Sequence, residues 1–215
     1  MTVFLTGSTG YMGRRLIPLL VERGHRVRAL VRAGSEKKLP AGCEPIVGDA
    51  LEAGTYAAAV SPADTFVHLV GVPCPNPWKG AQFRAVDLPS IRAAVSAATS
   101  ARVSHFVYLS VAHPAPIMKD YIDVRAEGER LLRESGMNAT FLRPWYVLGP
   151  GHYWPYLLVP LYFFFELLPA TRATAQRLGL VTLKQMLAAL VAAVEGPPSG
   201  VRIVEVPQIR AAVRK

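Results

Sequence analysis

A glycine-rich turn near the N-terminus has the residue types and the spacing of a phosphate-binding loop. Its three glycines stand three residues apart, between an apolar run that ends at Leu5 and apolar residues at helical spacing up to Gly24. Glycine allows a sharp backbone turn close to a pyrophosphate, and the free N–H groups at the start of the following helix stabilise its negative charge. The alternative is a turn that only joins a strand to a helix. We expect a dinucleotide to contact the whole loop, which consists of Gly7, Ser8, Thr9, Gly10, Tyr11, Met12 and Gly13.

The end of the second predicted strand carries a cation where an acid would be needed to recognise an unmodified ribose. Arg32 follows Gly13 by 19 residues, and Ser35, Lys37 and Lys38 come after it. An acidic side chain at this place accepts hydrogen bonds from both ribose hydroxyls, whereas an arginine binds a 2′-phosphate in a bidentate manner. We therefore expect NADP(H) to be preferred over NAD(H). A solvated basic turn is the alternative.

A second group of residues has the chemistry of proton transfer. Tyr121 and Arg125 stand four residues apart in a predicted helix, so they share one face and the cation can lie beside the phenol. Ser110 follows a predicted strand, at the end where a parallel sheet presents its ligand-contacting residues. An amphipathic tyrosine and an ordinary loop serine are the alternatives. The joint placement of the three residues favours a reaction site.

The glycine loop and this second group resemble parts of a known enzyme family. The GxxGxxG spacing is similar to that of short-chain dehydrogenases/reductases, in particular of their extended and atypical branches, which include NmrA-like NAD(P)H-binding proteins and sugar-nucleotide epimerases. The resemblance implies that Tyr121 is the general acid or base and that Ser110 orients a carbonyl. Arg125 takes the place of the lysine in the family's YxxxK motif, which binds ribose and lowers the pKa of the tyrosine. Arginine stays cationic but is a poor participant in a proton relay.

The resemblance covers residues 1 to about 151 and implies further contacts with the cofactor. Residues after the third and fourth predicted strands match the segments that contact adenine and line the cofactor in the family. The Arg-Pro turn near residue 144 matches a turn that lies near the nicotinamide. The matching positions are Asp49 and Ala50 for adenine, Val70 and Gly71 for the lining segment, and Pro144 to Val147 for the nicotinamide.

The elements that must hold these residues alternate along the chain. Short runs rich in Val, Ile, Phe and Tyr are separated by helical or loop segments, a pattern typical of a parallel sheet. The predicted strands are 3–5, 26–32, 44–47, 65–70, 104–109, 139–142 and 201–206. We therefore expect an α/β fold, a Rossmann-type doubly wound parallel sheet.

Helical spacing predicts helices over residues 12–23, 55–60, 81–100, 121–134 and 182–195. Pro18 should kink the first helix or delay its start, and Leu88-Pro89 should break the third. Asp120 is expected to cap the helix that carries Tyr121, and Gly136 to follow its end. Residues 72–77 contain three prolines and cannot form regular structure.

The C-terminal third contains an aromatic segment, residues 153–168, with Glu166 as its sole charge. Pro155 and Pro160 interrupt it, and it is shorter than the about 20 apolar residues that span a bilayer. We expect it to form a mostly buried lid or wall beside the nicotinamide. A lid over an apolar substrate, a homodimer surface and a peripheral membrane contact remain open for it. We predict two regions, an NAD(P)-binding domain over residues 1–151 and a small substrate or lid region over residues 152–215 packed on the same domain.

Composition excludes several classes of protein. Hydrophobic residues make up 51% of the chain and charged residues 18%, which excludes disorder. The net charge is +9, of which +6 lies in the first forty residues, but no helix carries a basic stripe interleaved with aromatic residues, so we do not expect a nucleic-acid partner. Cys43 and Cys74 lack the spacing of metal ligands, so no metal site is predicted. The two cysteines and the absence of a signal-like segment predict a cytoplasmic, or membrane-peripheral, location.

Three functions are compatible with the sequence. The first is an NADPH-dependent reductase of an apolar carbonyl or quinone-like small molecule, with Tyr121 as the proton donor. The second is an NmrA-like sensor or assembly protein that binds the cofactor without catalysis, suggested by Arg125 in the lysine position. The third is a sugar-nucleotide epimerase or dehydratase, although only about 64 residues follow Gly151, fewer than such enzymes use to bind their substrate.

Overall fold

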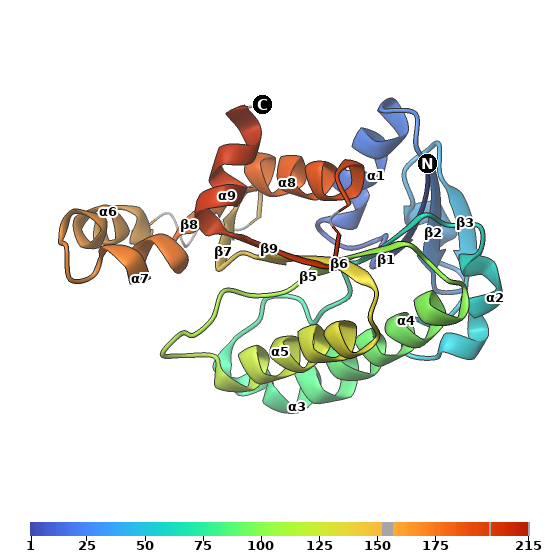
Figure 1. Ribbon diagram of the computed structural model, residues 1–215, viewed down its shortest axis with the longest axis horizontal. Coiled ribbons are helices and arrows are strands. Elements are labelled where there is room, and N and C mark those ends of the chain that lie inside the picture. The colour runs from blue at the N-terminus through green and yellow to red at the C-terminus, as the bar shows by residue number, and fades with distance from the viewer. Residues whose placement is uncertain (152–156, 198, 215) are drawn as a thin grey trace.

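The computed structural model describes residues 1–151, 157–197 and 199–214. Seven parallel strands form one sheet in the order β3-β2-β1-β4-β5-β6-β9 (Figure 1). The order reverses at β1, between β2 and β4, and doubly wound sheets bind their ligands at the carboxyl edge of such a reversal. The predicted Rossmann-type α/β fold is confirmed. The strands are β1 (Thr2–Thr6), β2 (Arg26–Val31), β3 (Glu44–Val47), β4 (Thr65–His68), β5 (His105–Leu109), β6 (Asn138–Arg143) and β9 (Val201–Glu205).

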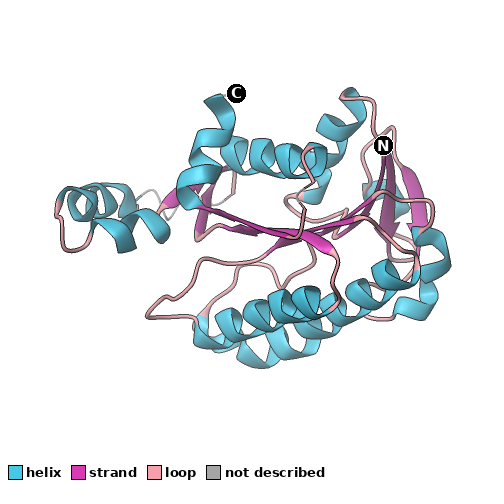
Figure 2. Ribbon diagram, in the orientation of Figure 1, coloured by secondary structure: helices cyan, strands magenta, loops and turns pink. Residues whose placement is uncertain are grey.

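Helices cover both faces of the sheet (Figure 2). On one face lie α1 (Gly13–Glu22) and α8 (Leu183–Glu195). On the other lie α2 (Ala57–Val60), α4 (Leu88–Ser100) and α5 (Lys119–Glu134). Among the described residues, these five helices pack on the two faces of the sheet.

The alternation of side chains along β1 explains the two layers of the core. Val3 and Leu5 are fully buried in the cluster that contains α1 and α8, whereas Phe4 is buried in the opposite cluster. Phe4 packs against Phe66 of β4, with ring centroids 5.2 Å apart. Because both faces of a central parallel strand are buried, its apolar residues form a continuous run instead of alternating with polar ones.

Two local predictions are wrong. The third helix is not broken at Leu88-Pro89, because α3 (Gly80–Gln82) continues through a π-helical turn (Phe83–Asp87) into α4. Pro89 lies in the first turn of α4, where its missing N–H is tolerated. The fourth strand ends at His68, so Val70 and Gly71 lie in the loop that follows it.

The start of α5 also differs from the prediction. The residue before the helix is Met118, with φ +65°, and its side chain makes no capping hydrogen bond. Asp120 lies in the first turn and forms an ion pair of 2.5 Å with Arg84. Gly136, with φ +71°, follows the end of the helix as predicted.

The C-terminal region completes the sheet. β9 pairs in parallel with β6, and the Thr182 hydroxyl and the Gln185 side chain form a reciprocal cap at the start of α8. A second, two-stranded sheet joins β7 (Tyr146–Leu148) to β8 (Leu180–Thr182). Residues on both sides of position 151 belong to one buried cluster, in which Val181 and Met186 lie with Val3.

A helical hairpin of α6 (Val159–Leu167) and α7 (Arg172–Arg177) projects from the end of the sheet (Figure 1). No residue of α6 is buried, and Phe163 is 65% exposed. The prediction that the aromatic segment is mostly buried is therefore wrong for residues 157–168; residues 153–156 lie outside the described part of the chain. Within the described residues, no helix has the length and apolar character needed to cross a membrane. A membrane or dimer contact through this segment stays a prediction.

Candidate functional site

The glycine loop joins β1 to α1 by close backbone contacts. A Cβ on Gly7, whose φ is +77°, would lie 2.7 Å from the carbonyl carbon of Leu69, in the loop after β4. A Cβ on Gly13 would overlap the carbonyl oxygen of Gly7. The Gly10 amide donates to that same oxygen over 3.0 Å. Glycine is therefore required at the first and third positions so that β4 and α1 can approach the loop.

The loop has the donor groups that a pyrophosphate needs. Among the described residues, the backbone amides of Met12 and Gly13 donate to no backbone carbonyl, and the first turn of α1 contains no acidic side chain. The hydroxyl of Ser8 donates to the carbonyl of Leu5 over 2.8 Å, which fixes the turn. A positive helix end with unpaired amides fits a diphosphate, so the residues present are suited to a dinucleotide.

Arg32 lies directly after β2, with an exposed side chain. Within the described part of the chain, its guanidinium forms no ion pair with an acid. The nearby Glu36 carboxylate accepts a hydrogen bond from the Gly34 amide over 3.2 Å. The geometry is thus compatible with a 2′-phosphate, and the preference for NADP(H) stays a prediction.

Asp49 lies after β3, at the same edge of the sheet as Arg32. Its Oδ1 accepts from the Leu51 amide over 2.9 Å, and its own amide donates to the Thr55 hydroxyl. Ala50 is partly buried beside it. These bonds hold the turn in which the family contacts adenine, and the contact itself remains a prediction for Asp49 and Ala50.

Arg125 is buried where the loops after β4 and β5 meet α5. Its Nη2 donates to Asp87 Oδ1 over 2.6 Å and to the carbonyl of Val70 over 3.2 Å, and its Nη1 donates to the carbonyl of Leu109 over 2.9 Å. The side chains of this ion pair are only 5% and 1% exposed. A Cβ on Gly71 would overlap Nη2, so glycine at this position admits the guanidinium.

The charge of Arg125 also acts on a buried histidine at the end of β4. His68 Nδ1 lies 2.8 Å from the Thr6 hydroxyl, and its Nε2 lies 3.4 Å from the Ser90 hydroxyl. Burial and the neighbouring charge of Arg125 lower the pKa of His68 to about 3. The imidazole is therefore neutral at physiological pH and serves as a hydrogen-bonding link between β1, β4 and α4.

Ser110 lies after β5, with its hydroxyl turned toward α5. It donates to Glu129 Oε1 over 2.7 Å, and the same carboxylate accepts two hydrogen bonds from Arg143. Burial raises the pKa of Glu129, but the hydrogen bonds from Arg143 and Ser110 and the charge of Arg143 outweigh it, so the pKa lies below its ordinary value. Glu129 is thus an ionised carboxylate that holds the Ser110 hydroxyl.

Tyr121 occupies the first turns of α5, one turn before Arg125. Its ring packs on Phe83 with centroids 4.9 Å apart, and the Arg125 guanidinium carbon lies 5.2 Å from its centroid. The prediction that the Tyr121 ring and the Arg125 cation lie next to each other is confirmed. The catalytic roles of Tyr121, Ser110 and Arg125 remain predictions.

These side chains surround a cavity of about 570 Å³ at the carboxyl edge of the sheet. Tyr11 and Met12 line it from the glycine loop, Ser110 follows β5, and Tyr121 lies on α5. The Arg-Pro turn contributes Pro144. The remaining lining residues are Cys74 to Pro77, Leu109, Val111, Ile117, Met118, Trp145 to Val147 and Gly151. One cavity therefore brings together the loop predicted to bind pyrophosphate and two of the three predicted catalytic side chains.

The sequence interpretation missed Asp87 and Glu129. Asp87 and Glu129 were passed over because charged residues in helices are usually solvated. Glu129 carried a signal, however, because it follows Arg125 by four residues and therefore shares the face of α5 on which Arg125 is buried. Among the described residues, no group of three His, Cys, Asp or Glu side chains could hold a metal ion.

Comparison with known proteins places this site in a family. Residues 7–150 match the model of a family described as NAD(P)H-binding. Over 210 residues the chain is 28% identical to a ceramide reductase of Caulobacter vibrioides, an alignment that covers 97% of this chain and 65% of the reductase. A 4-hydroxy-2-methyl-3-oxo-4-farnesyl-3,4-dihydroquinoline-1-oxide ketoreductase of Stigmatella aurantiaca is 27% identical, over 69% of this chain and 51% of its own length.

Two further matches are a relative with a different function and a solved structure with the same fold. The photosystem II assembly factor Ycf39 of Cyanophora paradoxa is 27% identical, over 66% of this chain and 44% of its own length. The structure of WbmH of Bordetella bronchiseptica, solved with NAD⁺, superposes with a TM-score of 0.69 at 21% identity, over 95% of this chain and 75% of that one. At that identity the likeness shows the fold alone. The chain spans between about two fifths and two thirds of the length of these three curated relatives.

Proposed function

The chain belongs to the NAD(P)H-binding family, among the atypical short-chain dehydrogenases/reductases, and from this we propose that it is an NADPH-dependent reductase of an apolar carbonyl or quinone-like substrate. The observation that carries the proposal is the cavity in which the glycine loop, Ser110 and Tyr121 face one another. Its walls are mostly apolar, so a substrate with few polar groups suits it.

The residues divide the reaction between them. When bound, NADPH would supply the hydride, and the amides of Met12 and Gly13 together with the exposed Arg32 would hold its phosphates. Tyr121 gives its hydroxyl proton to the oxygen that the hydride transfer makes negative. Two relatives support this chemistry, since one is named a reductase of ceramide and the other a ketoreductase of a farnesyl-bearing dihydroquinoline oxide.

A second function has its own support. Arg125 is bonded to Asp87 and to two backbone carbonyls, and Ser110 is bonded to Glu129, so two of the three predicted catalytic groups are engaged inside the protein. A protein that binds the cofactor without catalysis would tolerate this arrangement. One relative is named an assembly factor.

A cofactor titration followed by a substrate panel separates the two functions. We expect NADPH to bind and to be oxidised in the presence of long-chain ketones, aldehydes or quinones. Tyr121→Phe should lower kcat by about 100-fold, because general acid catalysis contributes that much, and leave the Kd for NADPH unchanged. Asp123→Asn, at an exposed position of α5 outside this cavity, is the control and should keep full activity. Binding of NADPH without oxidation by any of the panel would favour the non-catalytic function.

A further inference from the structure

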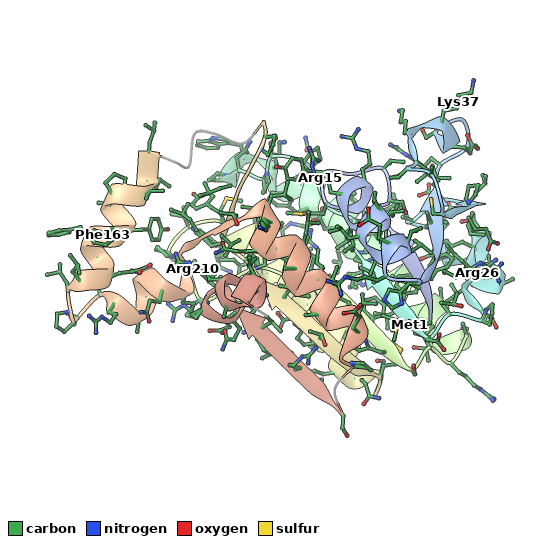
Figure 3. The ribbon with its side chains drawn as sticks, turned by 90° about the horizontal axis from the view of Figure 1, so that it is seen from above. Met1, Arg15, Arg26, Lys37, Phe163 and Arg210 are labelled. Atoms are coloured by element: carbon green, nitrogen blue, oxygen red, sulfur yellow. The ribbon has the colours of Figure 1, made fainter. Side chains whose placement is uncertain are left out.

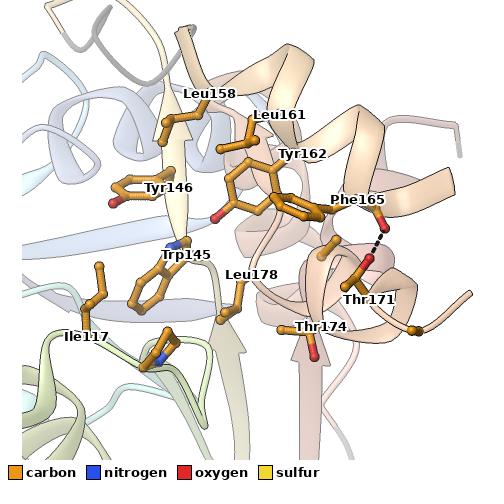
Figure 4. Close-up of a pocket in the computed structure, with 13 residues that line it drawn as sticks. Ile117, Trp145, Tyr146, Leu158, Leu161, Tyr162, Phe165, Thr171, Thr174 and Leu178 are labelled. Atoms are coloured by element: carbon orange, nitrogen blue, oxygen red, sulfur yellow. Dashed lines mark hydrogen bonds between the residues drawn. The ribbon is translucent and has the colours of Figure 1, made fainter. Parts of the chain in front are cut away.

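A second cavity of about 490 Å³ adjoins the one that contains Tyr121. Figure 4 shows its lining, with Trp145 and Tyr146 facing residues of the α6–α7 hairpin. Ile117, Trp145 and Tyr146 line both cavities, so these three side chains form the boundary between them. We call this second cavity the hairpin chamber.

The two helices of the hairpin present matching apolar faces to the hairpin chamber. From the α6 segment come Leu158, Leu161, Tyr162 and Phe165, at spacings of three, one and three residues. From the α7 segment come Thr171, Thr174, Ala175 and Leu178, at the same spacings. These are the positions that share one face of an α-helix, and in a folded domain such faces usually pack against each other or against a core. Here they line an open cavity instead, and Leu161 and Phe165 remain 48% and 37% exposed.

The hairpin chamber offers almost no polar group to a ligand. None of its lining residues carries a charge. The Thr171 hydroxyl donates to the backbone carbonyl of Phe165 over 2.7 Å, so its proton is already used inside the hairpin. A polar ligand would find its hydrogen bonds unmatched there, whereas a hydrocarbon would lose nothing.

The hairpin is held in place by a contact with the body of the protein. Arg210 of α9 (Val206–Ala211) donates to Glu166 Oε1 over 2.9 Å and to the carbonyl of Leu180 over 2.9 Å. Figure 3 shows Arg210 where the hairpin meets the body and Phe163 farther out on the hairpin. Of the three consecutive phenylalanines of α6, Phe165 lines the hairpin chamber and the other two do not.

We propose that the hairpin chamber binds the linear hydrocarbon chain of a substrate whose carbonyl lies in the cavity beside Tyr121. The proposal rests on the proposed reductase function for the carbonyl, but the chain-binding site is defined by the hairpin chamber alone. It specifies the substrate class as a carbonyl compound that carries one long apolar chain.

Calorimetric titration of the full chain with methyl ketones from hexanone to tetradecanone tests the site without requiring turnover. We expect the Kd to fall by about two- to fourfold for each added methylene group until the hairpin chamber is filled, because each buried methylene contributes a constant amount of binding free energy. A Kd that does not depend on chain length would overturn the proposal. Chain-dependent binding without reduction would keep the proposal and reject the reductase function.

Two pairs of variants test where on the protein the hydrocarbon chain of the ketone binds. Thr174→Trp should fill the hairpin chamber and weaken tetradecanone binding by about tenfold or more, with little effect on hexanone. Ala173→Trp, on the outer face of the same helix, is its control. Phe165→Ala should weaken tetradecanone binding about fivefold, and Phe164→Ala should not. Equal effects of the two substitutions within each pair would show that the hydrocarbon chain of the ketone binds elsewhere on the protein.

Discussion

The hydroxyl of Ser110 donates a hydrogen bond to Oε1 of Glu129 over 2.7 Å inside the protein. A hydroxyl has a single proton, so Ser110 can donate to a substrate carbonyl only when it releases Glu129. While it is bonded, Ser110 presents lone pairs to the cavity and accepts hydrogen bonds. The relationship makes Glu129 a positioning residue that sets the orientation of the Ser110 hydroxyl.

Replacing Glu129 by glutamine should lower the free energy of unfolding by about 3 kcal/mol at neutral pH, because it removes the buried counter-charge of the Arg143 guanidinium, which then keeps only the more exposed Glu205 carboxylate at 3.7 Å. The pKa of Glu129 lies below the ordinary 4.5, so its contribution is complete above that value and is lost as the pH falls through the lowered pKa. Denaturant unfolding at several pH values should therefore show the difference between the two proteins shrinking in acid. Glu127→Gln, which removes an exposed partner of Arg130, should cost less than about 1 kcal/mol.

Arg125→Lys should destabilise the protein and should not raise its activity. From the family resemblance alone, a lysine at this position would be expected to restore catalysis. The guanidinium, however, bonds Asp87 and the carbonyls of Val70 and Leu109 together, and a single ammonium cannot match that planar arrangement. We expect a loss of about 1 to 3 kcal/mol in the free energy of unfolding. Arg130→Lys, on the exposed side of the same helix, is the control; a gain in kcat for Arg125→Lys with unchanged stability would contradict this.

The fold could be predicted because the pattern of the sheet is local in the sequence. Each central strand is a short apolar run, and β3 was predicted to the residue. The pairing of β9 with β6 could not be predicted, because strand order depends on the packing of helices that are far apart in the sequence. The two short strands β7 and β8, with three residues each, carry too little pattern to be recognised.

The site was only partly predictable. Residues that follow strands could be placed at one edge, because parallel strands end together, and Ser110, Tyr121 and Tyr11 do line one cavity. What those side chains bond to could not be predicted, since Asp87 and Glu129 come from helices whose charged residues are typical of a solvated surface. The burial of the α6–α7 hairpin was predicted wrongly. Apolar composition indicates that a segment is buried on average, but it does not show which side of α6 contacts other residues.

Arg32→Asp should reverse the preference between the two cofactors. An aspartate repels a 2′-phosphate and accepts hydrogen bonds from ribose hydroxyls, so NADPH should bind about tenfold or more weakly and NADH more tightly. Titrations that follow the fluorescence of each reduced cofactor give both Kd values. Arg102→Asp makes the same change of charge at an exposed position after α4, away from the carboxyl edge, and should leave both values unchanged. Equal Kd values for NADPH and NADH in the unchanged protein would refute the assignment of Arg32.

The last prediction concerns stability in mild acid and depends on two buried histidines. Burial and the charge of Arg125 lower the pKa of His68 to about 3, and burial and the charge of Arg202 lower that of His105 to about 4. In the unfolded chain both return to the ordinary 6.5, so between these limits the unfolded state binds more protons and the free energy of unfolding falls as the pH falls. Between about pH 5 and about pH 6 each histidine should contribute a slope of about 1 kcal/mol per pH unit to the free energy of unfolding.

The variant His105→Gln tests the contribution of one of the two histidines. Its side-chain amide stays within reach of the Thr140 hydroxyl, which lies 3.0 Å from the histidine Nε2, and the variant should lose the part of the slope that His105 contributes. Unfolding curves at pH 8 measure any loss of packing separately, so an unchanged slope in the variant would mean that His105 is already charged in the folded protein.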